Sequence, residues 1–354
     1  MADLFENPLG TRGFAFVEFS SQDPDALALL FENMGFTAVS KHKVRDVIRY
    51  KQGNADFLLN REAGGQADRF NALHKGGANA MGFLVDDAEI AFEGALERGA
   101  TSANDGMWTE KLPAIEGIGG SLIYLMSVSD REAFFAEEFT AFAGVDEGLN
   151  DLGFTYIDHL THNVHRGQME VWGKFYENVF GFRQIRYFDI EGKLTGLISK
   201  AMTSPDGNIR IPLNESRDDK SQIEEFLHEF NGEGIQHIAI ASDHIFDSVD
   251  GLLANGLDLQ DTPDSYFDGI DERLPGHGEN VDELRKRRIL IDGAPTEGQG
   301  LLLQIFSKTV IGPVFFEFIQ RKGNDGFGEG NFQALFDSIE LDQVRRGVLE
   351  DASA

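Results

Sequence analysis

An internal duplication constrains the fold more than any other feature of this sequence, because its period is too long for a solenoid. Residues 13–19 have the pattern of a strand, and the helical segment that follows them ends near residues 30–36. Residues 154–160 repeat the strand pattern, and their helical segment ends near residues 175–182. A glycine stands at the end of each helical segment, where a positive φ angle costs little only for glycine.

A second correspondence lies downstream in both halves. Residues 79–85 and residues 236–241 have strand patterns, and a helical segment follows each of them. Asp86 and Asp243 stand between strand and helix, and the spacing from this aspartate to the glycine after the helix is the same in both copies. Aspartate is a preferred N-cap residue, so we expect both aspartates to cap these helices.

The two halves therefore predict an α+β protein that is built from two duplicated βαβββ modules. The strands of each module are expected to curl into an open barrel, as a half-barrel with one free side. Residues 144–151 have the composition of a linker, because small and acidic residues dominate them. We accordingly predict a first module of residues 1–148 and a second module of residues 149–354.

Composition excludes several kinds of partner and site. The chain has 31 basic and 60 acidic residues, a net charge of −29 with His neutral, so we expect neither nucleic acid nor a membrane as a partner. It has no cysteine, which excludes disulfides and zinc–thiolate sites and leaves His and carboxylates as the strong metal ligands. No stretch reaches the roughly 18 apolar residues of a membrane span, and the first residues lack a signal-peptide pattern. We expect a soluble, cytoplasmic protein.

Three polar residues of the second half lie within short apolar, strand-like segments: His159, His237 and Glu317. Burying a carboxylate in such a segment costs several kcal/mol unless a positive group compensates it. A divalent metal bound by two imidazoles and one carboxylate supplies that compensation, and this ligand set is typical of non-heme Fe(II) oxygenases. Any one of the three residues, taken alone, is better explained as an ordinary polar residue of a core.

The first half provides an internal control for this metal site. The expected counterparts of the three ligands are, in the same order, a residue near Glu18, Ala80 or Met81, and a residue near Tyr124. These residues could not assemble the same triad. We therefore expect the second module to hold the metal and the first module to be structural.

Several segments of the second half are similar to one known family. They are residues 157–163, 211–215, 220–223, 234–237, 302–306 and 316–321, and the most specific is the tail GFGEGNF at residues 326–332. They resemble the 4-hydroxyphenylpyruvate dioxygenases, especially the bacterial members, which have the vicinal oxygen chelate fold. The first half matches more loosely, as the metal-free domain of that family does.

The choice of the first histidine ligand needs a separate argument, because His159, His162 and His165 recur at three-residue spacing. Side chains of a strand alternate between its faces, so His159 and His162 cannot share one ion there. The family's ligand directly follows an Ile-Asp pair, and this resemblance selects His159. His162 and His165 are then expected to lie outside the metal's ligand set.

The resemblance implies a pocket for a neutral phenol ring. It implies that uncharged polar side chains surround the substrate: Ser199, Asn214, Gln222, Gln236 and Gln304. It implies aromatic contacts with the ring from Phe306, Phe315, Phe327 and Phe332, although Phe306 and Phe315 also fit ordinary core positions. Pro212, together with Asn214 and Phe306, is typical of the dioxygenase rather than of its sister enzyme, hydroxymandelate synthase.

The C-terminal segment is predicted to close over this pocket. Glycines at 326, 328 and 330 precede a helix that is expected from about Asn331 to Leu349, with apolar residues at three- and four-residue spacing. We expect this helix to cap the site as a lid. The alternative is a helix that packs on the core and never opens.

The resemblance implies an Fe(II) enzyme that converts 4-hydroxyphenylpyruvate and O2 to homogentisate and CO2 in tyrosine and phenylalanine catabolism. The 2-oxo acid would bind the metal through its carboxylate and keto oxygens, without a dedicated arginine. Three alternatives stay open: hydroxymandelate synthase, ring cleavage by an extradiol dioxygenase, and a non-catalytic binding protein of the same fold. The bacterial members imply a homo-oligomer, with a tetramer favoured over a dimer.

Overall fold

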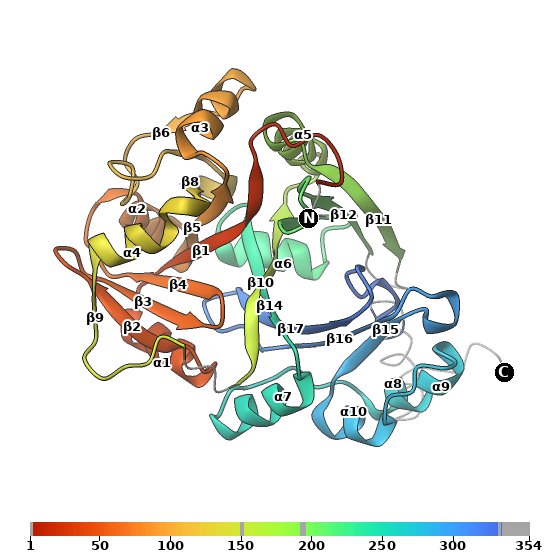
Figure 1. The fold of residues 1–354 in the computed structure, drawn as a ribbon. Helices are drawn as coiled ribbons and strands as arrows, with labels where there is room; N and C mark the ends of the chain where they lie inside the picture. The colour runs from red at the N-terminus through yellow and green to blue at the C-terminus, as the bar shows by residue number, and fades with distance from the viewer. Residues whose placement is uncertain (1–2, 149–151, 192–195, 332–333, 335–354) are drawn as a thin grey trace.

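Two curled sheets lie side by side in the computed structural model, which describes residues 3–148, 152–191, 196–331 and 334 of the chain (Figure 1). Within these residues, one sheet has nine strands, all from the first half, and the other has eight strands, all from the second half. The interval between the two sheets contains the predicted linker. We propose that the modules divide at residues 148 and 149.

The first module alternates strands with short helices. Its elements are β1 (Thr11–Ser21), α1 (Pro24–Asn33), β2 (Thr37–His42), β3 (Val47–Gln52), β4 (Ala55–Asn60), α2 (Gly65–His74), β5 (Gly76–Val85), α3 (Ala88–Glu97), β6 (Ser102–Ala103), β7 (Ala114–Glu116), β8 (Leu122–Ser127), α4 (Arg131–Glu138) and β9 (Phe139–Ala141). The strand order across the sheet is β6-β7-β8-β5-β1-β4-β3-β2-β9. β1, the first strand of the module, is therefore central.

The second module repeats this plan and adds helices between β14 and β15. Its elements are β10 (Phe154–Val164), α5 (Met169–Phe180), β11 (Arg183–Glu191), β12 (Gly196–Thr203), β13 (Arg210–Ser216), α6 (Gln222–Phe230), β14 (Gly234–Ser242), α7 (Ile245–Ala254), α8 (Asp264–Asp268), α9 (Ile270–Arg273), α10 (Val281–Arg287), β15 (Leu290–Gly293), β16 (Leu301–Phe306) and β17 (Phe315–Lys322). The strand order is β11-β12-β13-β10-β14-β17-β16-β15.

The strand pairings confirm the predicted duplication. β1 pairs in parallel with β4 and antiparallel with β5, and β10 does the same with β13 and β14. β5 then pairs in parallel with β8, as β14 does with β17. The helix ends agree as well, since Gly35 and Gly181 have φ angles of 79° and 73°. Two βαβββ modules with an α+β fold are therefore present.

The predicted N-caps are wrong by one residue. Asp87, not Asp86, caps α3, because its carboxylate accepts the backbone N–H of Ile90 at 3.0 Å. Asp86 instead accepts two hydrogen bonds from Arg12, at 2.8 and 2.7 Å. His244 occupies the N-cap position of α7 and makes no side-chain cap bond there, so Asp243 does not cap this helix. In both modules the helix therefore begins one residue later than its sequence pattern indicates.

Strand register places the three predicted metal ligands around the middle of the second sheet. Ala239 on β14 pairs with His159 on β10 and with Glu317 on β17. His237 lies two residues before Ala239, on the same face of β14. Three adjacent strands thus bring together residues that are far apart in the sequence.

The same register identifies the first-module counterparts. Gly82 on β5 pairs with Phe16 and with Tyr124, so Phe16 occupies the position of His159 and Tyr124 that of Glu317. The counterpart of His159 is therefore Phe16, not a residue near Glu18. The rings of Phe16 and Tyr124 are fully buried with their centroids 6.0 Å apart, and they fill the space that corresponds to the metal site. This arrangement explains why the first module cannot bind a metal at this position.

Glu18 has a structural role instead. Its carboxylate is buried and accepts hydrogen bonds from Asn60 and Asn79 at 2.9 and 2.7 Å and from the Trp108 indole at 2.5 Å. In Glu18→Gln the new amide N–H group would face these donors, and we expect the free energy of unfolding to fall by about 1–3 kcal/mol. Denaturant unfolding checks this loss. Metal analysis of the same variant should give the wild-type metal content. A lower metal content would contradict a purely structural role for Glu18.

The first module packs against β17, the strand that carries Glu317, on the side away from the ligands. Phe316 points away from Glu317 along β17 and packs against Phe19 and Phe57 of the first module, with centroid distances of 6.1 and 5.9 Å. The two modules share one continuous hydrophobic core. Among the described residues, no helix is long and apolar enough to cross a membrane.

Candidate metal centre and its cavity

The three predicted ligands converge in the structure. The Nε2 atoms of His159 and His237 lie 3.1 and 3.3 Å from Oε2 of Glu317. One ligand atom from each residue lies within 4.8 Å of the others, and all three residues are buried. Side chains of this kind at this spacing are suited to a single divalent cation with open coordination positions.

The surroundings of the Glu317 carboxylate indicate whether a cation fits between the three ligands. The residue is only 2% exposed, and its Oε1 atom has no hydrogen-bond partner. Burial by itself would raise the pKa of this carboxyl, but His159 and His237 outweigh burial and lower the pKa to about 2. The group is therefore a buried anion with one unsatisfied oxygen, and a bound metal would satisfy it.

Each histidine is held through its other ring nitrogen. Nδ1 of His159 lies 2.8 Å from Oδ1 of Asp158, and Nδ1 of His237 lies 3.1 Å from Oε1 of Gln236. When Nδ1 donates to these oxygens, the neutral ring presents the lone pair of Nε2 toward Glu317, as metal binding requires. Burial lowers the pKa of His237, whereas Glu317 and Asp158 overcome burial and raise the pKa of His159.

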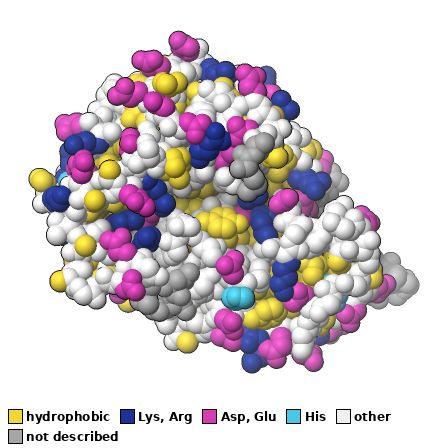
Figure 2. Space-filling view, viewed as in Figure 1, with side chains coloured by type: hydrophobic (Ala, Val, Ile, Leu, Met, Phe, Trp, Pro, Cys, Tyr) yellow, Lys and Arg dark blue, Asp and Glu magenta, His cyan; other side chains and the backbone are white. Residues whose placement is uncertain are grey.

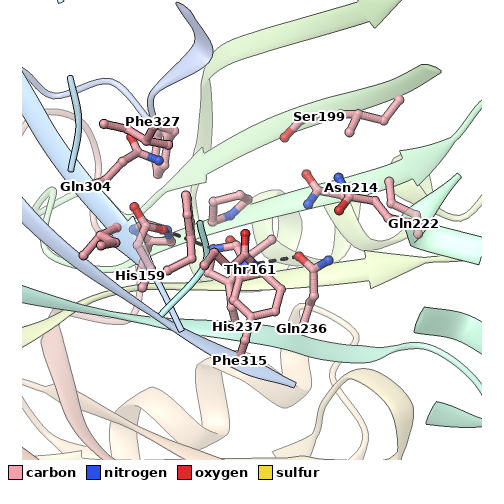
Figure 3. Close-up of a pocket in the computed structure, with 18 of the residues that line it drawn as sticks. His159, Thr161, Ser199, Asn214, Gln222, Gln236, His237, Gln304, Phe315 and Phe327 are labelled. Atoms are coloured by element: carbon pink, nitrogen blue, oxygen red, sulfur yellow. Dashed lines mark hydrogen bonds and ion pairs between the residues drawn. The ribbon is translucent and has the colours of Figure 1, made fainter. Parts of the chain in front are cut away.

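A cavity of about 380 Å³ opens above these ligands, which is within the usual size range of small-molecule sites. Figure 3 shows the histidines with Gln236 and Phe315 at one end of the cavity. Ser199, Asn214 and Gln222 lie together at the other end, and Gln304 and Phe327 lie at the side. The cavity thus has a potential metal site at one end and uncharged polar groups at the other.

The structure brings together nearly all the predicted site residues. The cavity is lined by all three predicted ligands and by nine of the ten other predicted residues: Ser199, Pro212, Asn214, Gln222, Gln236, Gln304, Phe306, Phe315 and Phe327. The tenth, Phe332, lies outside the described residues. The substrate contacts of these side chains stay predictions.

The other two histidines of the cluster lie away from the site. His162 is buried on the opposite face of β10, where its Nε2 atom lies 2.7 Å from the hydroxyl of Tyr176. Burial lowers its pKa to about 3, so the ring is neutral. His165 is exposed at the end of the strand. The expectation that His159 alone joins the triad agrees with this arrangement.

Comparison with known proteins agrees with the geometry. Residues 5–140 match the family described as "Hydroxyphenylpyruvate dioxygenase, HPPD, N-terminal", and residues 156–270 match the glyoxalase, bleomycin resistance protein and dioxygenase superfamily. A 4-hydroxyphenylpyruvate dioxygenase of Pseudomonas aeruginosa is 52% identical over 97% of both chains. The chain belongs to the 4-hydroxyphenylpyruvate dioxygenase family. A protein of Vibrio vulnificus named hemolysin VllY is also 52% identical, over 98% of this chain and 99% of its own.

Among solved structures, a mutant of 4-hydroxymandelate synthase from Streptomyces coelicolor has a similar fold. The TM-score is 0.78 with 23% identity, over 94% of this chain and 99% of that one. At this identity the likeness concerns the fold alone. The family assignment to the 4-hydroxyphenylpyruvate dioxygenases rests on the closer sequence relatives.

Sequence reasoning missed several residues of this dioxygenase's cavity. Thr161, Ile223 and Leu290 line it, as does Arg288, whose φ angle of 59° is rare for a non-glycine residue. Arg288 is not a free cation for a substrate carboxylate, because it forms ion pairs with Asp261 and Asp264 at 3.0 and 2.5 Å. Thr161 lies two residues after His159 on the same face of β10, so strand alternation already indicates its position. The other three residues reach the cavity only through the packing of distant elements.

The sequence predicts Asn331 only as the start of the expected C-terminal helix and indicates no contact for it in the site. Its Oδ1 accepts the Tyr266 hydroxyl at 2.5 Å, and its Nδ2 donates to Oε1 of Gln304 at 3.2 Å. With its oxygen occupied in this way, Gln304 has its amide N–H groups available as donors to a ligand. The predicted lid helix from Asn331 to Leu349 lies, apart from residues 331 and 334, outside the described residues.

Proposed function

We propose that this chain converts 4-hydroxyphenylpyruvate and O2 to homogentisate and CO2, with Fe(II) bound by His159, His237 and Glu317. The observation that carries the proposal is the buried carboxylate of Glu317 at one end of the cavity, with its Oε2 atom near two imidazole nitrogens and its Oε1 atom unsatisfied. Relatives that bear the name of this enzyme and match almost the full chain support it.

Bound Fe(II) would supply the redox chemistry that the use of O2 requires. With the single negative charge of Glu317, the occupied site would carry a net charge of +1. This charge complements a 2-oxo acid, whose carboxylate is its one anionic group. The cavity needs no free arginine for this purpose, which is consistent with the engagement of Arg288 by two aspartates.

The arrangement of the cavity suits a substrate with an anionic end, a flat ring and a neutral polar end. With the 2-oxo acid at the histidine end, the phenol hydroxyl would reach the group formed by Ser199, Asn214 and Gln222 (Figure 3). These side chains donate and accept hydrogen bonds without adding charge, so they suit a neutral phenol. Phe315 and Phe327 would hold the ring and keep water away from the reacting carbons.

Product analysis tests this function. Iron-loaded protein is incubated with 4-hydroxyphenylpyruvate in air, and the products are separated and identified by mass and NMR. We expect homogentisate and CO2, with one O2 consumed for each. 4-Hydroxymandelate as the main product would identify the sister activity. A ring-opened product would identify extradiol cleavage, and unchanged substrate would identify a binding protein.

Phe306 is expected to control where the ring is attacked. Its ring lies 6.0 Å from Phe315 and 6.3 Å from His237, at the edge of the space for the substrate ring. In Phe306→Ile, decarboxylation does not depend on the ring and should continue, but the ring would be held less firmly. The product mixture should shift toward benzylic hydroxylation or uncoupled by-products, as measured by chromatography against O2 consumption.

The control for this variant is Phe142→Ile, which changes an exposed phenylalanine of the first module. It should give homogentisate at the wild-type ratio to O2. If Phe306→Ile gives the same result as this control, Phe306 does not position the ring.

We further propose that the protein works in the cytoplasm as a homo-oligomer, with a tetramer favoured over a dimer. Its acidic composition supports a small-molecule partner over nucleic acid or anionic lipid. On the face shown in Figure 2, acidic side chains lie among basic ones over most of the surface. Sedimentation equilibrium of the purified chain measures the subunit number.

A further inference from the structure

Asp158 and Arg321 form a buried ion pair behind the metal site. The Asp158 side chain is fully buried and the Arg321 side chain is 11% exposed. Nε and Nη2 of Arg321 each donate to one oxygen of Asp158 at 2.7 Å, in the planar, two-pronged geometry that guanidinium allows. Arg321 outweighs burial and holds the pKa of Asp158 well below its usual range, so the pair stays charged.

The pair contacts His159 on one side. Oδ1 of Asp158 accepts the Nδ1–H of His159 at 2.8 Å, so the negative charge of the carboxylate lies next to the ring. A carboxylate at this position fixes the ring orientation and increases the basicity of the other nitrogen. A second cation, Arg210, lies 3.6 Å from Asp158, further away than Arg321.

On its other side the pair holds the turn that precedes Phe327. Nη1 of Arg321 donates to the backbone carbonyls of Asn324 and Gly326, at 3.0 and 2.7 Å. The next residue, Phe327, lines the cavity, and its ring packs edge-on against His159 with a centroid distance of 5.4 Å. A closed circuit of contacts therefore runs from His159 through Asp158 and Arg321 to Phe327 and back.

We propose that Asp158 and Arg321 are positioning residues that couple the orientation of the metal ligand His159 to the placement of the cavity wall at Phe327. The proposal rests on the proposed function, because it takes His159 to bind the metal. One guanidinium serves both tasks at once: two of its nitrogens fix the carboxylate and the third fixes the turn at residues 324–326. A lysine at this position could keep the charge but not both sets of contacts.

Two variants test the two tasks, and the second changes only one of them. Asp158→Asn combined with Arg321→Gln removes both charges of the pair together, and it weakens the hold on His159 as well as the hold on the turn before Phe327. Arg321→Lys keeps the charge next to Asp158 and releases the turn before Phe327. The matched control is Arg287→Lys, because Arg287 has the same 11% side-chain exposure and the same two-pronged bond to an aspartate, Asp250, away from the site.

The experiment has two readouts. Chelator-treated protein is titrated with Co(II) and followed by its absorption spectrum, and the iron-loaded protein is assayed for O2 consumed per homogentisate formed. We expect the double variant to raise the Co(II) dissociation constant by about 10–100-fold. We expect Arg321→Lys to raise the ratio of O2 to product while Co(II) binding stays near that of the control.

Each outcome decides the proposal. Wild-type binding and coupling in both variants would remove it while leaving the proposed function intact. A wild-type protein that binds no Co(II) would remove the proposed function and this inference together. If the double variant fails to fold, Arg321→Lys still tests the proposal. An unchanged ratio of O2 to product in that variant would show that Arg321 does not couple His159 to Phe327.

Discussion

Glu317→Gln is expected to abolish turnover and to weaken Fe(II) binding by more than about 10–100-fold, the range typical of changes outside the ligand set. Glutamine has nearly the same shape, so the fold should persist. The site would lose its one anionic ligand, and the two imidazoles would hold the cation without charge compensation. Iron content after gel filtration and the rate of homogentisate formation measure the two effects.

The control is the same substitution in the first module. Glu18 is also a buried glutamate, but its carboxylate is satisfied by three N–H donors and lies away from the triad. Glu18→Gln should therefore lose stability and keep its iron, whereas Glu317→Gln should do the opposite. Normal iron content and turnover in Glu317→Gln would remove the triad assignment.

Gly328→Ala is expected to lower kcat/KM by about 100-fold, as displacements of about 1 Å at a reacting site do. Gly328 has a φ angle of +78°, and a Cβ atom there would lie 2.7 Å from Cδ of Gln304 and still closer to its Oε1. The Gln304 amide cannot simply turn away, because Asn331 donates to it. Either Gln304 or the segment that carries Phe327 must move. Steady-state kinetics with 4-hydroxyphenylpyruvate measures the loss.

Gly298→Ala separates this clash from backbone strain. Gly298 has a φ angle of +76°, yet nothing lies within 4 Å of a Cβ atom at that position. Both variants should lose about 1–3 kcal/mol of stability from the left-handed backbone, and Gly298→Ala should keep the wild-type kcat/KM. Equal kinetic losses in the two variants would show that the contact with Gln304 is not the cause.

The fold and the ligands could be predicted from sequence because both leave local signals. Glycine after each helix and repeated strand patterns marked the duplication, and single polar residues inside apolar strands marked His159, His237 and Glu317. Packing then places such residues on neighbouring strands, since each strand pairs with the corresponding partner in both modules.

The errors arise at the ends of elements, which a sequence pattern locates only to within one or two residues. Phe16 rather than Glu18 matches His159 because β1 begins at Thr11, two residues before the expected start, whereas β10 begins at Phe154 as expected. Counting from the true first residue of each strand brings Phe16 and His159 to the same position.

Long-range contacts were equally invisible in the sequence. Asp158 belongs to the motif that selected His159, but its bond to Arg321 joins residues 163 positions apart. The link from Gln304 through Asn331 to Tyr266 likewise depends on three separate elements. Residue types alone could not indicate these partners, because many arginines and amides of the chain are equally plausible.

One titration tests the central claim, a single iron site in the second module, most directly. Chelator-treated protein receives increasing amounts of Fe(II) without air, and each sample is then given 4-hydroxyphenylpyruvate and O2. The rate of homogentisate formation should rise linearly and stop rising at one Fe(II) per chain. Homogentisate formed without iron, a break at a different ratio, or no product at any iron content would contradict the account.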